Sequence, residues 1–178
     1  MDILQNQTIK YFGYGSNKDL DMMVHIVGRH NLKGEPGKLL DYELCVQKLD
    51  QIRDCTPVSP REIIRKNFGE SFELFIARPK NGGEAYGTIW DLTLQELELV
   101  KNWEMIELGM QEEASAMAID SDGNTISVEI QAVINPPAAV DRIIAGSNYE
   151  PYIVPKEKML RASDYVREDY LKQKANKT

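Results

Sequence analysis

The strongest constraint on the fold comes from the segment Tyr11-Phe12-Gly13-Tyr14-Gly15-Ser16-Asn17. The residues before it, 8–12, are β-branched and aromatic, which is typical of a short buried strand. The residues after it, 18–27, carry apolar side chains at helical spacing and predict a helix. Gly13 and Gly15 allow backbone conformations that are closed to other residues, and they let a ligand approach the main chain closely. The segment therefore predicts a tight turn between a strand and a helix.

This turn is a candidate binding site. Ser16 and Asn17 are favoured N-cap residues, so the helix is expected to begin directly after the glycines. The backbone N–H groups at such a helix start point outward, with the positive end of the helix dipole behind them. They can hold a carboxylate or a developing oxyanion. An ordinary turn, in which the glycines only relieve strain, explains the same spacing, so the spacing alone leaves both interpretations open.

Length and charge limit the class of protein. A chain of 178 residues is expected to form a single domain, residues 1–178, that buries a sizeable core. Asp and Glu number 28 against 21 for Lys and Arg, which gives a net charge of −7. This balance argues against binding to nucleic acid or to an anionic membrane surface, because phosphate binding relies on basic residues.

The sequence also carries few signals of location. The first six residues lack the basic and apolar regions of a signal peptide, and charged residues interrupt every apolar segment, so no membrane span is expected. Cys45 and Cys55 have neither CxxC nor metal-ligand spacing and are expected to be reduced thiols. We therefore predict a cytoplasmic protein, without a prediction of its oligomeric state.

Strand and helix patterns alternate along the rest of the chain. After a loop at 33–37, alternating apolar residues predict strands at residues 38–48, 72–78, 84–92, 113–119 and 125–134. Turn-forming residues predict two hairpins, which pair 72–78 with 84–92 and 113–119 with 125–134. Helices are expected at residues 60–67, 93–103, 138–145 and 157–174, within a charged, mostly helical C-terminal segment from about residue 155. The predicted fold class is α+β, with a mixed β-barrel or open sheet and a few surrounding helices.

Two of these helices have N-terminal signals of their own. Ser59 precedes a proline at the first helical position, and Thr93 with Glu96 makes a capping box. The helix that begins near Thr93 runs to Trp103 and is followed by Glu104. A carboxyl group among large apolar neighbours loses hydration, which raises its pKa and suits it to general acid-base catalysis. A solvent-exposed Glu104 beside a buried Trp103 is the alternative.

The loop and this glutamate together resemble the γ-glutamylcyclotransferase family, including its AIG2-like members. The resemblance rests on Tyr14-Gly15-Ser16-Asn17 after an aromatic strand, on a later strand with Gly87-Thr88-Ile89-Trp90, and on Trp103-Glu104 after the following helix. The strand Leu39-Leu40-Asp41-Tyr42-Glu43-Leu44 is also similar to the family's second strand. The similarity covers most of residues 8–134.

The resemblance implies an enzyme that cleaves a γ-glutamyl amide without a metal or an organic cofactor. In this reaction the substrate's own α-amino group attacks the γ-carbonyl, and 5-oxoproline leaves together with a free amine or amino acid. Glu104 matches the general base and acid. Gly15, Ser16 and Asn17 would supply hydrogen bonds to the γ-glutamyl part, and Tyr14 would shape the pocket. The expected partner is this small-molecule substrate.

The chain departs from the family pattern at two places. The family's tyrosine-arginine pair after the glutamate is replaced by a segment that contains Met110, and a later tyrosine is replaced by Val140 when Pro136-Pro137 is aligned with the family. Tyr149 and Tyr152 are candidates to compensate. These departures leave the amine half of the substrate open. They also favour a competing hypothesis, a non-catalytic module that binds a small carboxylate ligand or a partner chain.

Metal binding is not expected. Asp120, Asp122 and Asn124 resemble the start of a calcium loop, but Thr125 stands where that loop requires glycine, so a hairpin turn is predicted instead. His25 and His30 do not share a helix face and have no cysteine or carboxylate frame around them.

Overall fold

Five strands close into a mixed β-barrel in the computed structural model, which describes residues 7–134 and 139–177. The barrel strands follow one another in the order β3-β1-β5-β4-β2, and pairing between β2 and β3 closes the ring. β1 and β5 run parallel, whereas the other barrel pairs are antiparallel. The strands are β1 Thr8–Gly13, β2 Gly34–Lys48, β3 Glu73–Thr93, β4 Glu112–Ile119 and β5 Thr125–Ala132. The α+β fold class predicted from the sequence is confirmed.

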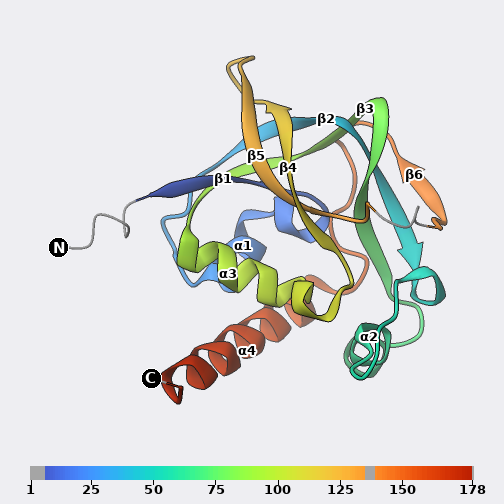
Figure 1. Ribbon diagram of the computed structural model, residues 1–178, viewed down its shortest axis with the longest axis vertical. Coiled ribbons are helices and arrows are strands. Elements are labelled where there is room, and N and C mark those ends of the chain that lie inside the picture. Colours follow the sequence, from blue (N-terminus) through green and yellow to red (C-terminus); the bar gives the residue numbers. More distant parts are fainter. Residues whose placement is uncertain (1–6, 135–138, 178) are drawn as a thin grey trace.

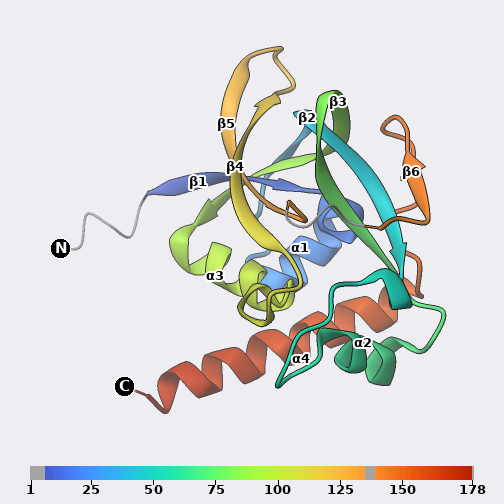
Figure 2. The same ribbon diagram turned by 45° about the vertical axis from the view of Figure 1, so that its right-hand side comes forward.

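The helices pack together beside the barrel. α1 Leu20–Val27, α3 Leu94–Trp103 and α4 Lys156–Ala175 gather on one side, and the tip of the β4–β5 hairpin projects on the other (Figure 1). α4 packs against both α1 and α3. α2 Pro60–Phe68 lies near the lower end of β2, and Figure 2 shows it in front of α4. No helix in the described ranges is long and apolar enough to cross a bilayer.

Successive side chains of β1 belong to two different apolar clusters, one on each side of the strand. Tyr11 points toward the helices and packs with residues of α1 and α3, such as Met22 and Val100. Its neighbour Phe12 points into the barrel and packs with residues such as Leu39. Successive strand residues face opposite sides of a sheet, so one short strand supplies both clusters. The segment that follows β1 is therefore held between the barrel and the helices.

Several predicted elements are confirmed at their expected positions. Ser59 accepts a hydrogen bond from the Glu62 N–H at the start of α2, and Thr93 with Glu96 forms the capping box of α3. β4 and β5 pair as the predicted hairpin. In the turn of this hairpin, the Asp120 carboxylate accepts hydrogen bonds from the backbone N–H groups of Asp122 and Asn124. α4 matches the helix predicted for the C-terminal segment.

The hairpin predicted between residues 72–78 and 84–92 is wrong. Both segments belong to β3, and both pair with β2 rather than with each other. The register between β2 and β3 shifts between Leu40 and Tyr42. There Asp41 has a positive φ of 60° and accepts the Gly82 N–H. Pro79 still pairs with Tyr42, and residues 80–83 form a bulge opposite Asp41, because β2 pairs with β3 on both sides of them.

Three smaller predictions also need correction. Residues 33–37 are not a loop, because β2 already begins at Gly34. The helix predicted at 138–145 is wrong where the structure describes it, because Arg142–Ile144 form β6, which pairs with Leu44, Cys45 and Val46 of β2. Pro136 and Pro137 lie outside the described residues. The first helix begins at Leu20, and its N-cap is Asp19 rather than Ser16 or Asn17, because residues Gly15–Lys18 form a separate 3₁₀ turn.

Candidate active site

The loop after β1 is held by contacts within the chain. The Trp90 indole N–H donates to the Asn17 carbonyl oxygen over 2.9 Å. A Cβ atom on Gly13 would lie 2.3 Å from this oxygen and 2.8 Å from the Trp90 nitrogen, so only glycine fits at this position. Gly15 has a φ of +58°, and a Cβ atom there would meet the Phe75 ring. Both glycines are thus required by the packing of the loop itself.

A tyrosine from the C-terminal part of the chain closes over this loop. The Gly15 N–H donates to the Tyr149 hydroxyl over 3.1 Å, and that hydroxyl donates to the Tyr86 carbonyl over 3.0 Å. The Lys18 ammonium group lies 3.6 Å from the centre of the Tyr149 ring. One of the backbone donors expected for a ligand is therefore occupied by a side chain of the protein.

Glu104 faces the loop across the end of α3. It is the C-cap residue of that helix, and Met105 with a positive φ of 53° turns the chain away directly after it. The Asn17 side-chain amide donates to Glu104 Oε1 over 2.7 Å. The Gln111 side-chain amide donates to Glu104 Oε2 over 2.8 Å. Each carboxylate oxygen thus has one fixed neutral donor.

Burial raises the pKa of Glu104 to about 7, against the opposing effect of the Asn17 and Gln111 hydrogen bonds. The two amides lower the pKa because they stabilise the charged form, but they carry no positive charge that would offset the lost hydration. A carboxyl group with a pKa near neutrality can both accept and return a proton at physiological pH. This electrostatic state fits the general acid-base chemistry expected for Glu104.

Two buried phenols complete the polar end of the site. The Tyr11 hydroxyl accepts a hydrogen bond from the Asn17 amide over 3.0 Å. The Tyr14 hydroxyl lies 2.9 Å from Gln111 Oε1 and 2.5 Å from the Gln131 carbonyl oxygen. Burial raises the pKa of both phenols, and the Glu104 charge raises it further. Both tyrosines therefore stay neutral and position the amides that hold Glu104.

The Asn17 side-chain oxygen is the exception in this group of paired atoms. It is buried and has no hydrogen-bond partner among the described residues. Asn17 itself is only 3% exposed, so the oxygen cannot exchange a protein partner for bulk water. Since buried polar atoms are normally paired, this acceptor is a candidate to receive a hydrogen bond from a bound ligand.

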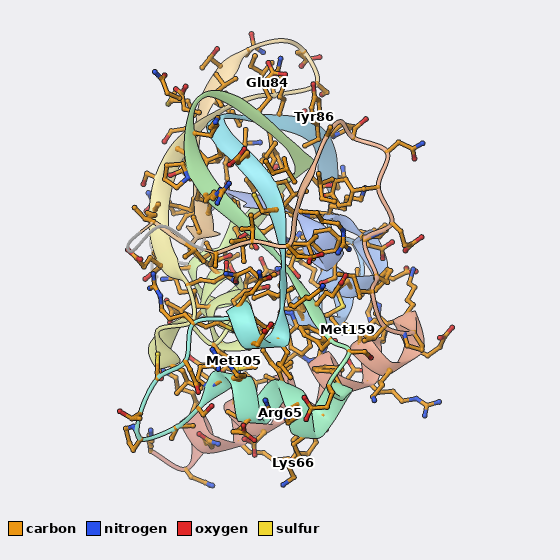
Figure 3. The ribbon with its side chains drawn as sticks, turned by 90° about the vertical axis from the view of Figure 1, so that its right-hand side faces the viewer. Arg65, Lys66, Glu84, Tyr86, Met105 and Met159 are labelled. Carbon is orange, nitrogen blue, oxygen red and sulfur yellow. The ribbon has the colours of Figure 1, made fainter. Side chains whose placement is uncertain are left out.

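A cavity of about 630 Å³ opens beside these residues. Tyr14, Gly15, Ser16, Asn17 and Glu104 all line it, so all the predicted site residues face one space. Apolar side chains from α2, the start of β3 and α4 form another part of its wall, and charged residues such as Glu73, Lys101 and Asp169 line it as well. Figure 3 shows Met105 and Met159 on the barrel side of α2. This volume is within the range of small-molecule sites.

The sequence did not identify Gln111 as a site residue, and it named Tyr149 and Tyr152 as candidates without placing them. Gln111 is 2% exposed and stands in the segment where the family pattern has a tyrosine-arginine pair, but no local signal distinguishes it from a surface glutamine. Tyr149 and Tyr152 are both near the loop, and the Tyr152 hydroxyl donates to Asp19 over 3.0 Å. Met110 lines the cavity, whereas Val140 packs with the cluster around Cys45 and is not among the lining residues.

The histidines and acidic residues make no metal-binding cluster within residues 7–134 and 139–177. His25 lies 2.8 Å from Asp164, which also pairs with Arg167, so this group joins α1 to α4.

Comparison with known proteins shows the fold. No protein-family model and no curated protein matches the chain. Among solved structures, one described as a gamma-glutamyl cyclotransferase superposes with a TM-score of 0.54 at 16% identity, covering 74% of this chain and 70% of that chain. An uncharacterized Homo sapiens protein gives 0.53 at 16% identity, with 75% and 70% covered. An Arabidopsis thaliana protein gives 0.51 at 18% identity, with 99% and 97% covered. The chain therefore has a γ-glutamyl-cyclotransferase-like α+β fold.

Proposed function

We propose that the protein is a cyclotransferase that cleaves a γ-glutamyl amide, of an amine or an amino acid, to 5-oxoproline and the free amine. The observation that carries this proposal is the state of Glu104. This residue lies in the wall of the cavity, its pKa is about 7, and its two carboxylate oxygens accept hydrogen bonds from Asn17 and Gln111. The fold, shared with a gamma-glutamyl cyclotransferase structure, supports the same reaction class.

The reaction needs one proton shuttle. Glu104 as carboxylate takes a proton from the substrate's α-ammonium group, and the resulting amine adds to the γ-carbonyl carbon. Protonated Glu104 then returns this proton to the leaving nitrogen, and the bond between the γ-carbon and that nitrogen breaks. The regenerated Glu104 carboxylate takes the second proton from the ring nitrogen and passes it to the departing amine, so that 5-oxoproline and the amine, as its ammonium ion, are released. Because the nucleophile belongs to the substrate, its effective concentration is high and no covalent enzyme intermediate is needed.

The unpaired Asn17 oxygen supports the placement of the α-ammonium group. A substrate N–H directed at this acceptor would satisfy a buried atom that lacks a partner in the chain. The same residue binds Glu104 through its amide nitrogen, so the nucleophilic nitrogen would lie close to the base. In this arrangement Tyr14, Gly15 and Ser16 form the wall beside the γ-glutamyl chain. A substrate oxygen could reach the Gly15 N–H only by replacing the Tyr149 hydroxyl.

The test is release of 5-oxoproline from a panel of γ-glutamyl amines and γ-glutamyl amino acids by the wild type and by Glu104→Gln. Glutamine keeps the size of the side chain but cannot shuttle protons, so we expect a loss of kcat of at least about 100-fold. The matched control is Glu98→Gln, which changes an exposed glutamate of α3 and should leave turnover unchanged.

The same panel separates the competing function. If the wild type releases no 5-oxoproline while γ-glutamyl compounds still raise its melting temperature, the chain is a binding module with an enzyme-like fold. Undiminished turnover by Glu104→Gln would refute the role of Glu104.

A further inference from the structure

The cavity has a polar end and an apolar arm. The polar end is lined by Asn17 and Glu104 together with Tyr11 and Tyr14, described above. The apolar arm, as we define it, is the part lined by Ile63 and Phe68 of α2, by Phe72 and Leu74 at the start of β3, by Met105, and by Met159 of α4. Phe72 and Met159 are 7% and 8% exposed, and Phe68 stacks on Phe72 with ring centres 5.2 Å apart.

We propose that this arm binds the amine half of the substrate, and that the substrate is a γ-glutamyl amide of an apolar amine without a carboxylate. This inference rests on the proposed function. Glu104 must reach the leaving nitrogen, and Met105, the next residue, lies in the wall of the arm. The amine half therefore begins beside Glu104 and extends along the apolar side chains.

The size of the cavity fits two halves rather than one. Sites of 300–1,000 Å³ typically hold drug-sized ligands, and a γ-glutamyl group is much smaller than these. A cavity of about 630 Å³ thus has room beyond the acyl half. The side chains that define the arm are apolar, so transfer of an apolar group from water into this part of the cavity is favourable.

The charges around the cavity disfavour an amino acid as the amine half. Its carboxylate is attached to the carbon next to the leaving nitrogen and would therefore lie close to Glu104. Of the two cations that line the cavity in the described chain, Lys101 is already paired with Glu98 and Glu113 at 2.9 and 2.7 Å. Arg161 is exposed on α4. A buried carboxylate without a cation carries a large desolvation cost.

A matched pair of substrates tests the proposal. γ-Glutamyl-pentylamide and γ-glutamyl-norleucine differ only by the carboxylate on the amine half. We expect kcat/KM for 5-oxoproline release to be at least about tenfold higher for the pentylamide. Along a series from methylamide to pentylamide, kcat/KM should rise by about fourfold for each methylene that is buried. An equal or higher kcat/KM for norleucine, or no rise along the series, would overturn the proposal.

Variants of α2 locate the effect in the arm. Phe68→Ala should flatten the chain-length series, because it removes one wall. Lys66→Ala, which changes an exposed residue of the same helix outside the cavity, should leave the series as in the wild type. Figure 3 shows Lys66 pointing away from the barrel. The comparison uses the ratio of kcat/KM values between substrates for one variant, so it does not depend on the fraction of that variant that folds. An unchanged series in Phe68→Ala would count against the arm.

The variant Arg161→Gln tests whether Arg161, the second cation that lines the cavity, binds a carboxylate on the amine half. A wild-type preference for norleucine that this variant removes would assign the carboxylate to Arg161 and overturn the proposal.

Failure of the proposed function has a different signature. If none of the compounds yields 5-oxoproline, the cyclotransferase proposal fails, and calorimetric binding of the same pair to the wild type then decides the inference. Tighter binding of the pentylamide supports an apolar arm that selects its ligand. Equal binding, tighter binding of norleucine, or no binding of either compound contradicts it.

Discussion

At the scale of single residues, the state of Glu104 is decided by two opposing effects. Burial disfavours the carboxylate, and the Asn17 and Gln111 amides favour it, with burial the larger effect. A salt bridge would have lowered the pKa instead, but the groups that contact Glu104 here are neutral amides. The consequence is a protein that is less stable when this residue is charged.

The stability of the wild type should therefore fall with pH relative to Glu104→Gln. The pKa of Glu104 is about 7 in the folded chain and about 4.5 in the unfolded chain. Between these values the folded state binds more protons, so the free energy of unfolding decreases as pH rises. We expect the difference between the two proteins to change by up to about 3 kcal/mol between pH 4.5 and pH 8. Urea unfolding at several pH values measures it.

The control for this experiment is Glu98→Gln, whose stability difference from the wild type should stay nearly constant over the same range. A constant difference for Glu104→Gln as well would mean that the Glu104 pKa is not raised.

Gln111→Met should raise the pKa of Glu104 further. Methionine matches the volume of glutamine but cannot donate to Oε2, and this hydrogen bond lowers the pKa in the wild type. The acidic limb of the kcat/KM profile reports the free enzyme, so it should move to higher pH. Gln47→Met is the matched control, since Gln47 is also buried but bonds to Gln51 and Ala139 instead. An unmoved limb in Gln111→Met would show that Gln111 does not act on the proton of Glu104.

At the scale of elements, the loop after β1 is positioned by segments distant in sequence. Trp90 of β3 holds the Asn17 carbonyl, and Tyr149 holds the Gly15 N–H. The chain around the start of α4 is held as well, because Tyr152 and Lys156 both contact Asp19, the N-cap of α1. The loop is therefore shaped by long-range contacts in addition to its own sequence.

Tyr149→Phe should free the Gly15 N–H for substrate. We expect KM for a γ-glutamyl substrate to fall, because the substrate no longer competes with the tyrosine hydroxyl. Stability should fall by about 1 kcal/mol, since the Tyr86 carbonyl also loses its donor. Tyr86→Phe removes a hydroxyl that donates to exposed Glu84, lies outside the cavity and keeps the Tyr86 carbonyl, so it should leave KM unchanged. If KM stays the same in Tyr149→Phe, the substrate does not use the Gly15 N–H.

At the scale of the whole molecule, closure of the barrel depends on a few small and large side chains at the junction of three strands. Leu39 of β2 pairs with Ala85 of β3 on one side and with Ala118 of β4 on the other. All three are at most 1% exposed. Two alanines leave the space that one leucine fills.

Leu39→Ala should therefore cost about 2–5 kcal/mol of unfolding free energy, because none of these neighbours can fill the void. Thermal or urea unfolding measures it. Glu84→Gln is the control at the opposite end of the barrel from α2 (Figure 3). It removes an exposed pairing with Lys38 that solvent screens, so it should leave the free energy of unfolding nearly unchanged. A cost below about 1 kcal/mol for Leu39→Ala would mean that the closure point repacks.

Much of the fold could be predicted from local sequence signals. The caps at Ser59 and Thr93 set the starts of α2 and α3, and both are confirmed because a cap satisfies N–H groups within the next three residues. The β4–β5 hairpin is confirmed for the same reason, since its turn is closed by Asp120 and its own neighbours. Such features need no information from distant parts of the chain.

Where local signals allowed more than one pairing partner, the tertiary structure decided which pairing formed. Residues 79–83 have the composition of a hairpin turn, but pairing with β2 on both sides made residues 80–83 a bulge. Arg142–Ile144 became a strand because the edge of β2 was available there.

The site itself depends on this long-range order. The sequence supplied Tyr14, Gly15, Ser16, Asn17 and Glu104, but only the fold brings Asn17 within 2.7 Å of Glu104 across 87 residues of sequence. It also adds Gln111, which no local pattern identifies, and it places Tyr149, named from the sequence only as a candidate, on the Gly15 N–H. Caps and turns are determined by neighbouring residues, whereas a buried carboxyl group depends on atoms that only the folded chain brings around it.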